Sequence, residues 1–216
     1  MKRNVISAEL EAYILGVHSG SDDSLFRELR EATAQFGEDA IMQIPDHQGT
    51  FLTLITKILG ARTALEIGTF TGHSSISIAR GLPEDGSLLC LDMSREWTNV
   101  ARTFWERAGL TGKVELRIGD ALETISEFDS SMKFDLVHID AEKTLYDRFF
   151  EAAFPYVRSG GVFLFDNMLR HGRVLEPQSD ERTEAIKTLN QKLAGDPRIE
   201  TVLIEMGDGI QMCRKK

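Results

Sequence analysis

Cysteine and long apolar stretches are what this 216-residue chain most obviously lacks. Its two cysteines, Cys90 and Cys213, are far apart and without metal-ligand spacing, so they predict neither a disulfide framework nor a zinc site. No run is long and apolar enough to span a bilayer. Glu9 and Glu11 interrupt the segment after the basic start at residues 1–6, which argues against a signal peptide. We therefore expect a cytoplasmic protein with reduced thiols.

Positive charge is also scarce. The chain has 25 Lys and Arg against 34 Asp and Glu, a formal net charge of −9. Nucleic acids and anionic membranes both attract basic surfaces, so this balance argues against broad binding to either. The balance does not exclude a local basic rim at Arg158, Arg170 and Arg173 that binds an anionic partner.

Strand-like and helix-like segments alternate along the chain, which is typical of a mostly parallel sheet with helices on both faces. Strands are expected at residues 63–67, 87–91, 114–118, 134–139 and 161–165, with a C-terminal hairpin at 201–206 and 210–213. Helices are expected at residues 7–16, 24–36, 48–59, 72–80, 95–108, 142–157 and 179–193. Ser7 and Ser24 are candidate N-caps, and the loop at 170–180 is expected to be mobile. The pattern predicts one α/β domain over residues 1–216, with a helical extension at 1–40 and the core at 41–216.

Polar residues follow two of the expected strands at the point where each ends. Asp140 comes directly after the strand at 134–139, and Asp166 and Asn167 follow the strand at 161–165. Open α/β sheets bind ligands at the carboxyl ends of their strands. Three hard oxygen donors suit Mg²⁺ or Ca²⁺, and Lys143 could orient or deprotonate a substrate hydroxyl. This set predicts a metal-assisted reaction on an oxygen nucleophile.

A glycine-containing turn at 68–72 follows the first expected strand. Its spacing matches neither the dinucleotide fingerprint nor a P-loop. Asp92 ends the second strand, where an acid can accept hydrogen bonds from ribose hydroxyls. Asp120 and Ala121 could bracket an adenine ring, and Glu66 could meet the amino group of a ligand. Acids around a glycine turn without a phosphate cradle favour a cationic nucleoside such as S-adenosylmethionine.

These segments together resemble the cation-dependent class I S-adenosylmethionine O-methyltransferases, which include the catechol and caffeoyl-CoA O-methyltransferases. The resemblance begins near Met42 and rests, in order, on residues 64–72, 82–86, 139–143, 160–162, 166–172 and 207–209. It implies a Rossmann-like fold, a seven-stranded mostly parallel sheet with a reversed last strand, and a homodimer.

The resemblance also implies roles for individual residues. Asp140, Asp166 and Asn167 would bind Mg²⁺ or another divalent cation such as Mn²⁺ or Ca²⁺, and Lys143 with Asp140 would be catalytic. The expected contacts to S-adenosylmethionine are Met42, Ile44, Glu66, Gly68, Thr69, Ser74, Asp92, Met93, Asp120, Ala121 and Asp140. The expected substrate contacts are Lys143, Asn167, Arg170 and His171. Arg170 stands where relatives commonly have Trp, which suggests an acidic substrate tail or a different pocket wall.

The leading hypothesis is methylation of a hydroxyl on a catechol-like phenol, with S-adenosylmethionine and a divalent cation. The alternative is methylation of 5-hydroxyuridine in tRNA, as in some bacterial members of the family. A nicotinamide-dependent oxidoreductase is disfavoured by the missing glycine pattern. A non-catalytic adenosine-binding protein is disfavoured by the intact metal set and Lys143.

Overall fold

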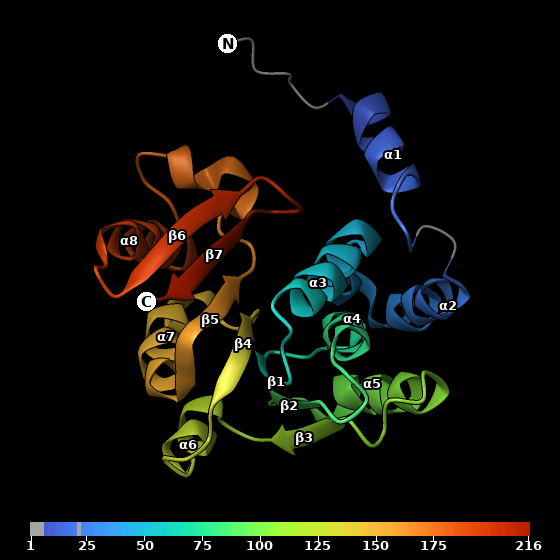
Figure 1. The fold of residues 1–216 in the computed structure, drawn as a ribbon. Coiled ribbons are helices and arrows are strands. Elements are labelled where there is room, and N and C mark those ends of the chain that lie inside the picture. Colours follow the sequence, from blue (N-terminus) through green and yellow to red (C-terminus); the bar gives the residue numbers. More distant parts are fainter. Residues whose placement is uncertain (1–6, 21–22) are drawn as a thin grey trace.

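The computed structural model describes residues 7–20 and 23–216, and the basic start at residues 1–6 lies outside them. Within the described chain a single sheet has the strand order β3-β2-β1-β4-β5-β7-β6 (Figure 1). The strands are β1 (Thr63–Ile67), β2 (Ser87–Asp92), β3 (Val114–Ile118), β4 (Phe134–Ile139), β5 (Val157–Phe165), β6 (Ile199–Ile204) and β7 (Ile210–Lys215).

One strand of this sheet is reversed. β1 to β5 pair in parallel, whereas β7 pairs antiparallel with both β5 and β6. The β6–β7 turn can be tight because Gly207 (φ 56°) and Gly209 (φ 86°) adopt left-handed backbone conformations. The expected seven-stranded sheet with a C-terminal hairpin is confirmed.

Helices cover both faces of the sheet, each over its own apolar cluster. One face packs against α2 (Ser24–Thr33), α3 (Asp46–Ile58), α4 (His73–Gly81) and α5 (Arg95–Arg107). The other packs against α6 (Ala121–Ser126), α7 (Tyr146–Ala153) and α8 (Glu181–Gly195). Both clusters contain fully buried side chains, such as Leu52 on the first face and Phe163 on the second. Burial on both faces explains the near-continuous apolar runs of the central strands.

Several elements differ from the sequence-based expectation. The helix expected at 142–157 is three pieces: η2 (Lys143–Leu145), α7, and η3 (Phe154–Tyr156). Pro155, which lacks an N–H, sits in the first turn of η3, where the α-helix has ended. The helix α6 was not expected because it is short and begins at Asp120, whose side chain caps it.

The N-terminal helices also differ. α2 ends at Thr33 and continues as the 3₁₀ segment η1 (Ala34–Met42), which is kinked at Gly37. Its N-cap is Asp23 rather than Ser24, because the Asp23 side chain accepts a hydrogen bond from the Leu25 N–H.

Two loops have more structure than the sequence indicated. β5 extends back to Val157, across a register shift against β4. The loop expected at 170–180 contains the 3₁₀ segment η4 (Arg170–Leu175), with a left-handed kink at His171 and Gly172.

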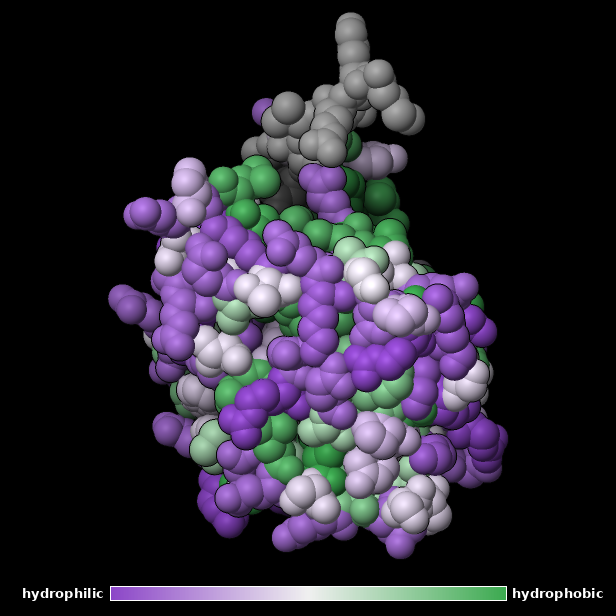
Figure 2. Space-filling model, turned by 90° about the vertical axis from the view of Figure 1, so that its left-hand side faces the viewer, coloured by the Kyte–Doolittle hydropathy of each residue, from purple (hydrophilic) through white to green (hydrophobic). Residues whose placement is uncertain are grey.

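The first helix, α1 (Ala8–Gly16), lies beside α3, away from the sheet (Figure 1). Ser7 caps it as expected. Its exposed apolar side chains include Leu10, Tyr13 and Ile14, and Figure 2 shows apolar surface at the top of the molecule. Across the described ranges, no helix is long and apolar enough to cross a membrane.

Candidate active site

The site lies at the carboxyl ends of the parallel strands. Backbone pairing continues just past these ends: the Asp140 N–H donates to the Ile67 carbonyl (2.9 Å), and the Asp166 N–H donates to the Ile139 carbonyl (3.0 Å). The two acids are therefore fixed at one edge of the sheet, where a cavity of about 630 Å³ opens. Its size falls within the range typical of small-molecule sites.

Gly68 allows the turn after β1 to pass directly against β4. Its φ is 88°, and a Cβ there would lie 1.9 Å from the carbonyl oxygen of Asp140. Only glycine fits this approach without moving the backbone. Glycine at position 68 is therefore required for the turn after β1 to lie directly against Asp140.

Lys143 is held by two partners at the edge of the cavity where Asp140 lies. Its Nζ donates to Asp140 Oδ1 (2.8 Å) and to the Tyr146 hydroxyl (2.8 Å). The hydroxyl donates in turn to the backbone carbonyl of Asp166 (3.1 Å). Tyr146 is fully buried, and burial followed by the nearby carboxylates raises its pKa well above the ordinary value. A neutral phenol thus fixes the ammonium group beside both acids.

Asp166 is almost fully buried, with both carboxylate oxygens bound. Oδ1 accepts the Asn167 N–H (2.7 Å), and Oδ2 accepts the Gln48 side-chain amide (2.7 Å). Burial, and then the carboxylate of Asp140, raise the pKa of Asp166 to about 6. Two acids that repel each other in a buried site are stabilised by a cation between them.

The expected metal set is assembled at this point. Asp140, Asp166 and Asn167 all line the cavity, and Asn167 has a left-handed backbone (φ 58°). Two carboxylates and one amide fit a hard cation that keeps other positions open. In the described part of the chain no group of three or more His, Cys, Asp or Glu side chains is suited to hold a metal. The expected set has two such side chains, Asp140 and Asp166, and the amide of Asn167.

Most of the expected cofactor residues line the same cavity. Those that do so are Met42, Ile44, Gly68, Thr69, Ser74, Asp92, Met93, Asp120, Ala121 and Asp140. Two of the acids also organise the backbone. Asp92 accepts the N–H groups of Thr69 (2.8 Å) and Phe70 (2.9 Å), and Asp120 accepts that of Leu122 (2.7 Å).

Glu66 is not among the residues that line the cavity. It is a fully buried residue of β1, where it accepts a hydrogen bond from Cys90 Sγ (3.4 Å) and lies 3.5 Å from His138 Nδ1 on the neighbouring strands. Burial opposes charge on His138, yet the adjacent Glu66 raises its pKa. Side chains alternate across a strand, so Glu66 points away from the face shared by Leu65 and Ile67. The sequence could not tell which face this was.

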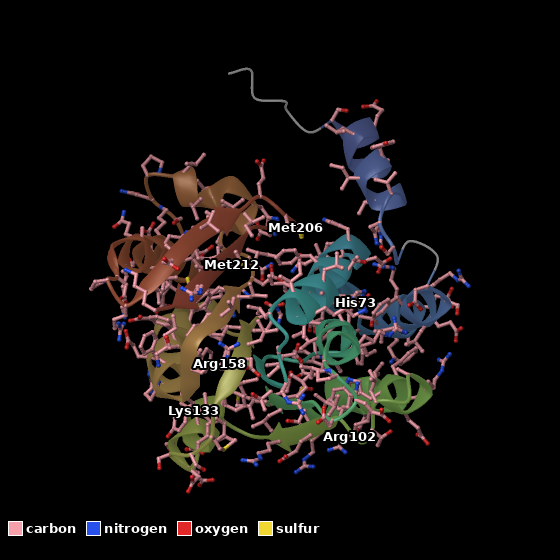
Figure 3. The ribbon with its side chains drawn as sticks, viewed as in Figure 1. His73, Arg102, Lys133, Arg158, Met206 and Met212 are labelled. Atoms are coloured by element: carbon pink, nitrogen blue, oxygen red, sulfur yellow. The ribbon has the colours of Figure 1, made fainter. Side chains whose placement is uncertain are left out.

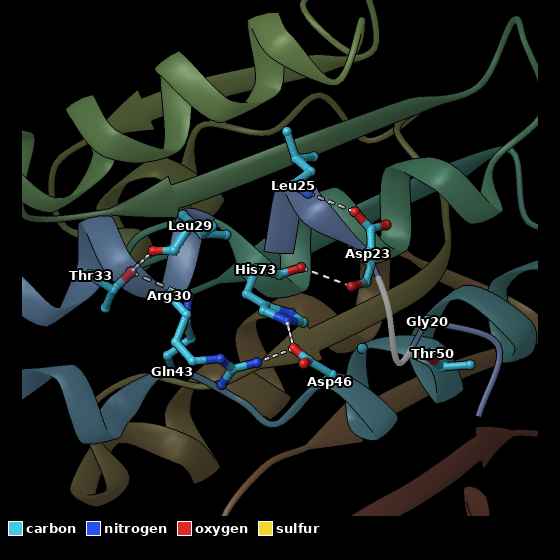
Figure 4. A network of polar contacts seen from close by, with 12 residues as sticks. Gly20, Asp23, Leu25, Leu29, Arg30, Thr33, Gln43, Asp46, Thr50 and His73 are labelled. Atoms are coloured by element: carbon cyan, nitrogen blue, oxygen red, sulfur yellow. Dashed lines mark hydrogen bonds and ion pairs between the residues drawn. The ribbon is translucent and has the colours of Figure 1, made fainter. Parts of the chain in front are cut away.

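An N-terminal wall closes one side of the cavity, because residues 41–45, at the end of η1 and in the link to α3, line it. His73, where α2, α3 and α4 meet, bonds through Nε2 to Asp46 Oδ1 (2.9 Å), and Arg30 pairs with the same carboxylate (Figures 3 and 4). Burial lowers the pKa of His73, and its ring stacks on Phe26 at 4.1 Å. These contacts fasten the wall to α4.

Two residues that organise the site, Tyr146 and Gln48, are not predicted from the sequence. Tyr146 follows Lys143 by three residues, and that spacing was the only signal available. Gln48 is 118 residues from Asp166 in the chain, so nothing local in the sequence indicated their contact.

Comparison with known proteins identifies the class. The structure matches an O-methyltransferase from Bacillus cereus solved in complex with SAH, with a TM-score of 0.88, 32% identity, and coverage of 96% of this chain and 97% of that one. It also matches the O-methyltransferase TomG of Streptomyces achromogenes, involved in tomaymycin synthesis and solved with SAM (TM-score 0.87, 27% identity, 96% of each chain). The fold is that of the class I S-adenosylmethionine-dependent methyltransferases.

The family follows from the sequence profile described as O-methyltransferase, which matches residues 17–216. The chain belongs to the O-methyltransferase family. Caffeoyl-CoA O-methyltransferase 1 of Arabidopsis thaliana is 34% identical, over 97% of this chain and 85% of the relative. The expected family, and the expectation of an O-methyltransferase enzyme, are confirmed.

Proposed function

We propose that this protein methylates one hydroxyl of a catechol-like phenol, using S-adenosylmethionine and a divalent cation. The observation that carries the proposal is the ammonium group of Lys143, held by Asp140 and Tyr146 beside the buried carboxylate of Asp166. The name of the Arabidopsis relative and the SAH and SAM in the two similar structures support the choice of reaction and cofactor.

The cavity residues divide between the two ligands. Thr69, Ser74 and Asp92 lie on the side of the glycine turn and would hold S-adenosylmethionine. Asp140 and Asn167, with Asp166, lie at the other end and would hold the cation. When bound, S-adenosylmethionine supplies an electrophilic methyl group, and a divalent cation supplies Lewis acidity that lowers the pKa of a nearby hydroxyl.

As an ammonium group, Lys143 would donate a hydrogen bond to the acceptor oxygen while the hydroxyl proton leaves to solvent. It could accept that proton itself only as the neutral amine, after first losing one of its own protons to solvent. A free phenol titrates near ~10, judged by tyrosine, so its proton must be held or removed as the methyl group arrives. Asp140 and Tyr146 keep Nζ in one place, and Gln48 keeps the Asp166 carboxylate oriented. Holding the two reactants in line is the remaining requirement.

Lysine and aspartate variants test these roles. Asp140→Ala should abolish cation-dependent turnover while the protein remains folded. Lys143→Ala should lower kcat far more than it weakens affinity for S-adenosylhomocysteine, measured by calorimetry. Lys133, at the opposite end of β4 (Figure 3), donates to the Pro155 carbonyl, and Lys133→Ala is the matched control. Full activity of Asp140→Ala or Lys143→Ala would refute its assigned role.

The tRNA alternative has less support. Two of the three arginines in the basic rim expected for it are neutralised, Arg158 by Asp135 and Arg173 by Asp180. Neither of them lines the cavity. The homodimer implied by the family resemblance stays a prediction, and light scattering of the purified protein would test it.

A further inference from the structure

Arg170 is the unusual charge in the cavity wall. It is partly buried, and no residue in the described part of the chain forms an ion pair with its side chain or a hydrogen bond with its buried Nε. Every other arginine in residues 7–20 and 23–216 is either exposed or held by an ion pair. A partly desolvated guanidinium with unused donors is costly, and an anion would satisfy it.

The backbone around Arg170 is held in an uncommon conformation. Arg170 (φ 49°) and His171 (φ 54°) are consecutive non-glycine residues in the left-handed region. Such residues are rare, and they persist where surrounding contacts impose them, often at ligand sites. Here the contacts come from the β6–β7 turn: the carbonyl of Asp208 accepts the Leu169 N–H (2.9 Å), and its carboxylate accepts the His171 N–H.

The neighbouring positive groups are already engaged. Arg182 also lines the cavity, but both ends of its guanidinium bind Glu142 (3.0 and 2.6 Å). Arg173, three residues from Arg170, is bound by Asp180 and lies outside the cavity lining. Arg170 lines the same cavity as Asn167, and its backbone N–H donates to the Asn167 carbonyl (3.3 Å). Among the cavity-lining residues that the structure describes, Arg170 is the basic side chain without a carboxylate partner, so it is free to meet a ligand.

Building on the proposed function, we propose that Arg170 binds an anionic group of the acceptor. The preferred acceptor is then a catechol that carries a carboxylate on its side chain. The carboxylate accepts paired hydrogen bonds from the guanidinium, while the reacting hydroxyl meets Lys143.

A pair of acceptors that differ only in charge tests this inference. The two are 3,4-dihydroxycinnamate and its neutral methyl ester, compared by kcat/KM for methyl transfer. We expect the acid to be preferred by roughly 10- to 100-fold, the range for a charge-assisted hydrogen bond. Arg170→Gln should bring the ratio close to one, and Arg170→Lys should give an intermediate ratio. Arg173→Gln, the matched control, should retain the full preference.

Inhibition supplies a measurement that needs no variant. 3,4-Dimethoxycinnamate should inhibit the unaltered enzyme more strongly than its methyl ester does. Equal turnover of acid and ester, equal inhibition by the two dimethoxy compounds, or an unchanged ratio in Arg170→Gln would each overturn the role of Arg170 and leave the proposed function standing. Absence of methyl transfer to either catechol would refute the proposed function, and this inference with it.

Discussion

Replacing Tyr146 by Phe removes one hydroxyl from the centre of the site and nothing else. In the folded protein that hydroxyl accepts a hydrogen bond from the Lys143 ammonium and donates one to the Asp166 carbonyl. The variant leaves Lys143 with Asp140 as its remaining partner and leaves a buried carbonyl unpaired. Hydrogen bonds to charged groups contribute about 1.5–3 kcal/mol. We therefore expect the free energy of unfolding to fall by about 2 kcal/mol.

The effects of Tyr146→Phe on stability and on catalysis are measured separately. For a domain of this size, 1 kcal/mol corresponds to about 2–4 °C in Tm, so thermal unfolding should shift by about 4–8 °C. An ammonium group that is less firmly placed should lower kcat for a catechol by at least about tenfold. Affinity for S-adenosylhomocysteine should change little, because the partners of the hydroxyl are the Lys143 ammonium group and the Asp166 carbonyl, neither of which is expected to contact the cofactor.

Tyr156→Phe is the matched control. The Tyr156 hydroxyl also donates to a backbone carbonyl, that of Phe128 (3.3 Å), but it has no contact with Lys143. Its loss should lower Tm without lowering kcat. If Tyr146→Phe lost stability yet kept kcat within about twofold, Tyr146 would be a packing residue and the positioning role assigned to it would be refuted.

Three further predictions follow from particular contacts. Gly68→Ala places a methyl group against the Asp140 carbonyl and should destabilise the protein by at least about 3 kcal/mol in urea unfolding; an unchanged midpoint would contradict the close approach. The pKa of Asp166 is about 6, and a cation needs the ionised carboxylate. The Tm increase given by Mg²⁺ should therefore be larger at pH 8 than at pH 5. Equal increases would argue against Asp166 as a ligand. The Arg198 guanidinium lowers the pKa of Glu151 to about 2. The stabilisation that the ionised Glu151 gives the folded protein is therefore present above about pH 4.5 and is lost as pH falls toward 2. Glu151 is 41% exposed, so Glu151→Gln should cost less than about 1 kcal/mol at pH 7, a difference that disappears in acid.

Individual residues show which parts of the site can be predicted from the sequence. Asp140, Asp166 and Asn167 could be placed together because Asp140 and the pair Asp166 and Asn167 come directly after apolar runs, and the ends of parallel strands meet at one edge. Lys143 could be added because it lies close to Asp140 in the chain. Local pattern therefore predicts the strand ends and the groups attached to them.

The remaining features depend on contacts that local pattern does not contain. The role of Gln48 depends on a partner more than a hundred residues away. The placement of Glu66 depends on which face of β1 meets the cavity, which alternation alone leaves open. Whether Arg170 has an ion-pair partner depends on every other side chain near it in the folded protein, which local sequence pattern does not show. The helix at 142–157 was expected to be continuous because its apolar spacing was helical, although Pro155 interrupts it.

The central claim is tested most directly by methyl transfer from labelled S-adenosylmethionine to catechols, with bulk tRNA as a parallel acceptor. Each reaction is run with Mg²⁺ and with a chelator in its place. We predict that catechols are labelled with Mg²⁺, that the chelator abolishes labelling, and that tRNA is not labelled. Labelling of catechols that the chelator leaves unchanged, or labelling of tRNA alone, would contradict this prediction.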